Sequence, residues 1–82
     1  MANRVGEKLE ELIKRDGMNQ NTLAGKLGCT RQNIQQIISG RMRMSPQIAV
    51  KLERVFEYTA SYWLALRSDD DLEVARQRLN NK

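Results

Sequence analysis

The most informative segment of this 82-residue chain reads Gln20-Asn-Thr-Leu-Ala24-Gly-Lys-Leu-Gly28-Cys-Thr-Arg-Gln-Asn-Ile34-Gln-Gln-Ile37. Two short helices that meet at a steep angle need a small side chain where they approach most closely, and Ala24 provides it. The turn between them needs a backbone conformation that glycine adopts cheaply, at Gly28. Ile34 and Ile37, three residues apart, then hold the second helix against the first. The segment therefore predicts a two-helix unit over residues 20–40.

The packing of Ile34 and Ile37 leaves the other side of the second helix without a role in the core. That side carries Arg31, Gln32, Asn33, Gln35, Gln36 and Ser39. Solvated helix faces usually draw on lysine and glutamate, whereas arginine and the side-chain amides form paired hydrogen bonds with base edges. We interpret this side as a DNA-reading surface, and a merely polar exposed face is the alternative.

Helix signals continue on both sides of this unit. Val5, Leu9, Leu12 and Ile13 form the apolar stripe of a first helix that stops near Gly17. Asn19 and Thr30 are suited to cap the two central helices, which end at Gly28 and Gly40. Ser45-Pro46 marks the start of a fourth helix, with inner residues Ile48, Ala49, Leu52, Val55 and Phe56.

The remaining segment is predicted to hold one or two further helices. Thr59 opens a short helix through Leu66, and Asp69 to Asp71 favour the N-terminus of a last helix. The inner face of that last helix would be Leu72, Ala75 and Leu79. Since no alternating run indicates a strand, the expected fold is all-α, with five to six short helices in a single domain over residues 1–82.

Charge is distributed unevenly along the chain. The net charge is +4, but residues 17–52 contain no aspartate or glutamate. The cations of this acid-free segment are Lys26, Arg31, Arg41, Arg43 and Lys51. A surface that faces phosphates must lack carboxylates, since each would repel the nucleic-acid backbone. The alternative is chance clustering.

Composition excludes several function classes. One cysteine and no histidine leave no disulfide within the chain, no zinc site and no histidine-based catalysis. We therefore expect no enzyme activity, no metal and no cofactor. No apolar run approaches the roughly 20 residues of a membrane span, and the first residues lack the apolar stretch of a signal peptide. A cytoplasmic protein without a membrane partner is expected.

The central segment resembles the helix-turn-helix of the phage-repressor and Cro family, the lambda-repressor-like fold, including the glutamine that opens its first helix. The resemblance implies that Gln20 braces the DNA backbone and that the recognition helix reads bases with Arg31, Gln32, Asn33 and Gln36. It further implies backbone contacts from Thr30, Ser39, Arg41 and Arg43, to which Lys26 is added as a candidate.

The downstream sequence is similar to HigA-type antitoxins, also called plasmid-maintenance antidote proteins. The resemblance covers about residues 5–78 and rests on Gly40 to Phe56, on Tyr62-Trp63-Leu64-Ala-Leu66 and on Asp71-Leu72. It implies a homodimer that binds a double-stranded DNA operator, represses its own operon and neutralises an mRNA-cleaving toxin. Its two recognition helices would enter successive major grooves, roughly 34 Å apart.

The region of residues 59–79 is the candidate surface for the dimer or the toxin. Its candidate contacts are Tyr62, Trp63, Leu66 and Leu72. Trp63 suits either the core of a small domain or an interface, because large aromatic side chains anchor both. Two other functions stay open: a stand-alone phage-type or chromosomal repressor without a toxin, and an adaptor that binds protein through the same helical face.

Overall fold

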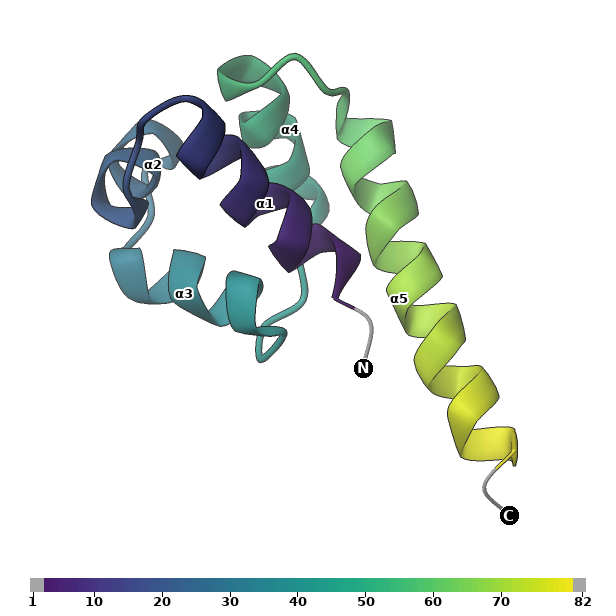
Figure 1. The fold of residues 1–82 in the computed structure, drawn as a ribbon. Helices are drawn as coiled ribbons and strands as arrows, with labels where there is room; N and C mark the ends of the chain where they lie inside the picture. The colour runs from purple at the N-terminus through teal and green to yellow at the C-terminus, as the bar shows by residue number, and fades with distance from the viewer. Residues whose placement is uncertain (1–2, 81–82) are drawn as a thin grey trace.

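Five helices make up residues 3–80, the part of the chain that the computed structural model describes. They are α1 (Arg4–Arg15), α2 (Gln20–Leu27), α3 (Arg31–Ser39), α4 (Pro46–Val55) and α5 (Ala60–Asn80) (Figure 1). These residues contain no strand, so the all-α prediction is confirmed. None of these helices is long and apolar enough to cross a membrane.

Helices α2, α3 and α4 begin at the capping residues that the sequence singles out. Asn19 Oδ1 accepts a hydrogen bond from the Thr22 amide at 2.8 Å, and Thr30 Oγ1 accepts one from the Asn33 amide at 3.1 Å. Ser45 caps α4 in the same way, with Pro46 as its first residue. These side chains satisfy amides that have no partner within their own helix.

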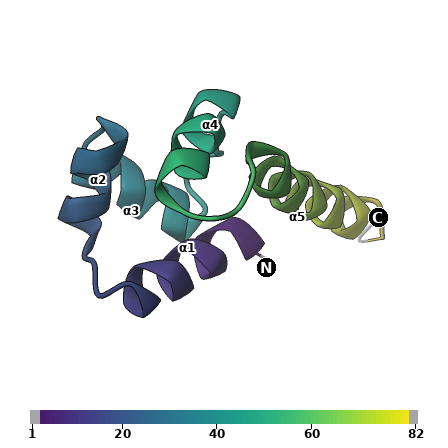
Figure 2. The ribbon, with the colours of Figure 1, turned by 90° about the horizontal axis from the view of Figure 1, so that it is seen from above.

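A single core holds the helices together. α1 packs against α3 and α5, α2 packs against α3 and α4, and α4 packs against α5. Seen from above, α1 to α4 form one group, and α5 extends away from one side of it (Figure 2). Among the largest buried side chains are Leu9, Leu23, Ile34, Leu52 and Trp63, each with at most 1% of its surface exposed. Burial of these side chains is the main source of stability in a domain of this size.

The C-terminal segment differs from the prediction of two short helices. α5 runs without interruption through 21 residues, so the expected helix start at Asp69 to Asp71 is wrong. No glycine or proline stands between residues 60 and 80 to break it. Asp70 instead accepts hydrogen bonds from Arg4, and Asp71 pairs with Arg43. These tertiary contacts explain the acidic residues without a helix terminus.

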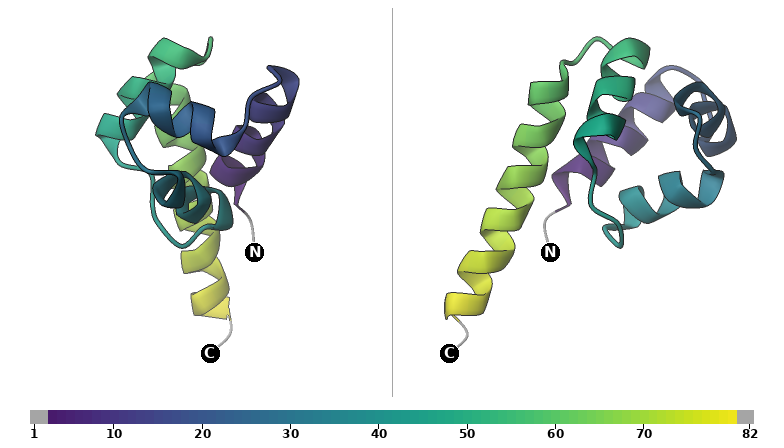
Figure 3. Two further views of the ribbon diagram at one scale, coloured as in Figure 1. Left: turned by 90° about the vertical axis from the view of Figure 1, so that its left-hand side faces the viewer. Right: turned by 180° about the vertical axis from the view of Figure 1, so that it is seen from behind.

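The predicted inner face of the last helix is also wrong. Leu72, Ala75 and Leu79 are exposed, and Asp70, Glu73 and Val74 lie half-buried on the side that faces the domain. The C-terminal half of α5 projects beyond the other helices (Figure 3). The molecule accordingly measures 43 Å along its longest axis and 21–22 Å across.

An ion pair joins the C-terminal end of α1 to the segment after α4. Arg15 donates from both Nη atoms to Glu57, at 2.7 and 2.8 Å, and also contacts Asp16. The hydrogen bonds from Arg15 lower the pKa of Glu57 from its ordinary 4.5 to about 2, and the same contacts raise the pKa of Arg15. A carboxyl whose pKa falls on folding stabilises the folded chain above its ordinary pKa.

Gly28→Ala and Gly25→Ala are predicted to change stability in opposite directions. Gly28 has φ +69°, where an added Cβ costs about 1–2 kcal/mol. Gly25 is helical, and a Cβ there would meet no atom within 4 Å, so alanine should stabilise the chain by about 0.5–1 kcal/mol. Urea unfolding of both variants measures the difference. A Gly28→Ala protein with the same free energy of unfolding as the wild type would contradict the left-handed conformation at this position.

Glu57→Gln is predicted to lower the melting temperature at pH 7, because it removes the carboxylate that Arg15 binds. The difference from the wild type should shrink as the pH falls from 4.5 to about 2, where Glu57 itself becomes protonated. Thermal unfolding followed by circular dichroism across this range tests the prediction. Glu10→Gln, on the exposed side of α1, is the control and should have no such effect. A difference that persists unchanged at pH 2 would contradict the assignment.

Candidate nucleic-acid interface

The turn between α2 and α3 fixes how the two helices meet. Gly28 closes α2 in the left-handed conformation, at φ +69° and ψ +32°. The Cys29 amide then donates to the Ala24 carbonyl at 3.0 Å, and Thr30 caps α3. Ala24, Ile34 and Ile37 all belong to the buried core, with 4%, 0% and 2% exposure. The helix-turn-helix over residues 20–40 is therefore present as predicted from the sequence.

The side of α3 opposite Ile34, Ile37 and Ile38 faces solvent. Arg31, Gln32 and Ser39 are exposed, and Asn33 and Gln36 are half-buried. Gln35 is also exposed, and its position in the helix places it between Gln32 and Ser39 on this free side. Gln35 is thus a further candidate reading residue. The period of 3.6 residues, applied to the whole of α3, is the signal that identifies it.

The C-terminal end of α3 is attached to the start of α1. Asn3 Oδ1 accepts from the Gly6 amide at 3.1 Å, and Asn3 Nδ2 donates to the Ile38 carbonyl. A Cβ on Gly6 would collide with that same carbonyl oxygen, so only glycine permits the approach. These contacts, which short sequence motifs do not reveal, attach the C-terminal end of α3, as the turn at Gly28 attaches its N-terminal end.

Four of the five cations of the acid-free segment have no carboxylate partner, against four of the eight cations in the rest of residues 3–80. Outside the segment, Arg4, Lys8, Arg15 and Arg67 each lie within 4.0 Å of a carboxylate. Within residues 3–80, no carboxylate lies that close to Lys26, Arg31, Arg41 or Lys51. All four are exposed. Their charge is therefore available to an external anion such as a phosphate.

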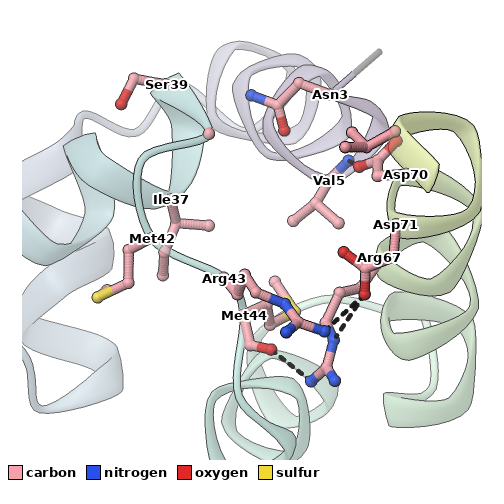
Figure 4. A pocket seen from close by; sticks show the side chains of 12 residues that line it. Asn3, Val5, Ile37, Ser39, Met42, Arg43, Met44, Arg67, Asp70 and Asp71 are labelled. Atoms are coloured by element: carbon pink, nitrogen blue, oxygen red, sulfur yellow. Dashed lines mark hydrogen bonds and ion pairs between the residues drawn. The ribbon is translucent and has the colours of Figure 1, made fainter. Parts of the chain in front are cut away.

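Arg43 is the exception within the acid-free segment. Its Nη2 lies 2.6 Å from Asp71 Oδ2, and Arg67 Nε lies 3.8 Å from the same oxygen. Arg67 also donates to the Met44 carbonyl at 2.9 Å. Figure 4 shows Arg43, Arg67 and Asp71 together beside a cavity of about 210 Å³. The loop after α3 is thus fastened to α5, and Arg43 remains 67% exposed.

The other candidate backbone contacts lie at the ends of α3 and at the start of α2. Thr30 and Ser39 are exposed at its two ends, although the Ser39 hydroxyl donates to the Gln36 carbonyl at 3.2 Å. Gln20 is half-buried at the first position of α2, and its Oε1 is buried without a hydrogen-bond partner in residues 3–80. Thr30 and Ser39 therefore lie at the two ends of α3, and Gln20 lies at the start of the preceding helix.

The candidate interface residues of α5 separate into three groups. Trp63 is fully buried, so its side chain belongs to the core of the chain and not to an interface. It packs among Phe56, Tyr58 and Tyr62, with ring centroids 5.8–6.4 Å away. Tyr62 and Leu66 are half-buried against the core, and Leu72 is 47% exposed. An interface on α5 therefore has to use its outer side.

Two curated bacterial proteins align with part of this chain. The virulence-associated protein A of Dichelobacter nodosus is 39% identical over 49 residues, 58% of this chain. An uncharacterised helix-turn-helix-type transcriptional regulator of Haemophilus influenzae is 35% identical over 69 residues, 83% of this chain. The aligned parts span 48% and 64% of the lengths of these relatives.

Solved structures match over most of the fold. A proposed antidote protein of a plasmid maintenance system from Nostoc punctiforme superposes with a TM-score of 0.90 and 27% identity. A HigA-family addiction module antidote protein from Coxiella burnetii superposes with a TM-score of 0.85 and 29% identity. Each comparison covers 94% of this chain and 85% of the other.

A family model described as helix-turn-helix matches residues 9–63, which contain α2, the turn and α3. The match covers more than half of the chain. It includes the whole of α3, whose polar side is exposed. The chain therefore belongs to the helix-turn-helix family, and its resemblance to the HigA-type antitoxins of that family is confirmed.

Proposed function

We propose that this protein is a sequence-specific DNA-binding antitoxin, which represses its own toxin–antitoxin operon as a homodimer and neutralises an mRNA-cleaving toxin. The observation that carries the DNA-binding part is the free side of α3, rich in arginine and amides, beside exposed cations without carboxylate partners. Such a surface offers base-edge contacts and phosphate contacts from one rigid helix.

The reading residues are Arg31, Gln32, Asn33 and Gln36, with Gln35 added from its exposure. In the major groove, arginine donates two hydrogen bonds to guanine, and glutamine or asparagine pairs with adenine. Backbone contacts come from Gln20, Thr30, Ser39, Lys26, Arg41 and Arg43. A dimer would place two copies of α3 on half-sites one helical turn apart or a multiple of one.

The antitoxin part of the proposal rests on the relatives. The two solved structures described above as antidote proteins superpose on 94% of this chain at 27–29% identity. A toxin would bind in the cytoplasm, outside the DNA-reading side of α3. The proposed protein acts by binding and has no catalytic role.

Arg31→Ala is predicted to lower discrimination between DNA sequences, by about 1–3 kcal/mol for each guanine contact that it makes. Arg41→Ala is the matched control. It removes the same charge next to α3, but the contact that it removes is to a phosphate and not to a base. It should weaken binding to all sequences alike and reduce the salt slope by about 1. Fluorescence anisotropy with a duplex selected from a random library, and with a scrambled duplex, measures both. Unchanged discrimination by Arg31→Ala would contradict the reading role.

A toxin encoded beside this gene is predicted to co-purify with the protein and to lose its mRNA cleavage in the complex. Expression of the neighbouring reading frame, alone and together with this chain, measures both effects. Specific DNA binding without any such toxin would instead support the alternative of a stand-alone repressor. Failure to bind any duplex at low salt would leave a protein-binding adaptor and would contradict the proposal.

A further inference from the structure

The outer side of α5 forms an exposed stripe with a seven-residue repeat. It consists of Ala65, Ser68, Leu72, Ala75 and Leu79, which we call the outer stripe. All five are exposed, and Leu72 and Leu79 have 47% and 69% of their surface in solvent. Spacings of three and four residues place them on one side of the helix, opposite Trp63, Asp70 and Val74. The other side of α5 already packs against the domain. The two exposed leucines are therefore available to pack against a second helix.

Charged residues border the outer stripe on both sides, and each border repeats the same order. Asp69 precedes Arg76 by seven residues on one border, and Asp71 precedes Arg78 by seven residues on the other. All four are exposed. Each border therefore presents an acid toward the start of α5 and a base toward its end. Each border is therefore complementary in charge to the same border of a second α5 that runs in the opposite direction.

An antiparallel copy of α5 satisfies this pattern in one register. When Leu72 lies opposite the partner's Ala75, Leu79 lies opposite the partner's Ser68. In the same register, the border positions bring Asp69 beside the partner's Arg76 and Asp71 beside the partner's Arg78. By symmetry each pair occurs twice. Asp71 also binds Arg43 and Arg67 of its own chain, so the two pairs of Asp69 with the partner's Arg76 carry the charge complementarity. A parallel copy brings only Asp71 near the partner's Arg76 and leaves Asp69 without a basic partner.

We propose that the outer stripe binds a second copy of this chain, with the two α5 helices antiparallel and Leu72 opposite the partner's Ala75. The inference rests on the proposed homodimer and deepens it by naming the face, the direction and the register. The outer stripe extends for about 21 Å along the helix. Trp63 and Leu66 then serve the core, and Leu72, Ala75 and Leu79 serve the interface.

Charge reversal at one border tests the direction of the helices. Asp69→Arg and Arg76→Asp should each weaken self-association about tenfold at low salt, because each puts two like-charged pairs in the dimer. A mixture of the two single variants should form a heterodimer, since every border pair is then opposite in charge. The double variant should recover the wild-type affinity. Sedimentation equilibrium of the full chain, without DNA, measures all four.

Two further variants separate the interface from the fold. Leu72→Glu combined with Leu79→Glu should give a monomer, because both side chains are exposed in the single chain. Its melting temperature should equal that of the wild type at concentrations low enough for the wild type to be monomeric. Glu10→Arg reverses a charge on α1 and should leave the dimer unchanged. A wild-type chain that stays monomeric would leave the outer stripe to another protein and would overturn the proposal. A mixture that associates no better than either single variant would overturn the antiparallel direction.

DNA binding is measured separately on the same proteins. The Leu72→Glu, Leu79→Glu chain should still prefer a duplex with one half-site over a scrambled duplex, with lower affinity for the complete site. Dimers that form as described but bind no DNA would count against the proposed function alone. Sequence-specific binding by a chain that never pairs through α5 would count against this inference alone.

Discussion

The left-handed backbone at Gly28 lets α2 stop and α3 start within three residues, so that Ala24, Ile34 and Ile37 enter one core. Because α3 is only nine residues long, it has little stability of its own and depends on this packing. Asn3 secures its other end through the Ile38 carbonyl. A helix held at both ends presents its polar side in a fixed position, which paired hydrogen bonds to base edges require.

Charge pairing separates the chain into two functional parts. Within residues 3–80, four of the eight cations outside residues 17–52 form ion pairs, such as Arg15 with Glu57 and Arg4 with Asp70. The cations around α3 lack such partners, apart from Arg43. Exposed pairs contribute little to stability, so the separation matters mainly for what each surface attracts. In the described part of the chain, the region around α3 carries exposed positive charge without nearby carboxylates, and α5 carries both acids and bases along its length.

Local signals predicted the helix-turn-helix well because its determinants are local. The capping residues Asn19, Thr30 and Ser45 and the turn at Gly28 act within a few residues of their own positions. The end of the chain was harder, since Asp69 to Asp71 resemble a helix start until Arg4 and Arg43 are known to lie beside them. The apolar spacing places Leu72 and Leu79 on one side of a helix, but spacing alone does not decide whether that side packs against the same chain or against another one. On sequence alone, Leu72 is accordingly a candidate for both roles, and Leu79 for the inner face alone. Trp63 could be placed only once α4 and α5 were seen to pack together.

The central claim is that the free side of α3 contacts DNA. Nuclear magnetic resonance of the isotope-labelled chain, titrated with a duplex selected from a random library, tests it residue by residue. The side-chain amide signals of Gln32, Asn33, Gln35 and Gln36 should shift most, together with the backbone amides at the starts of α2 and α3. Shifts confined to α5, or none near α3 at saturating duplex, would contradict the account.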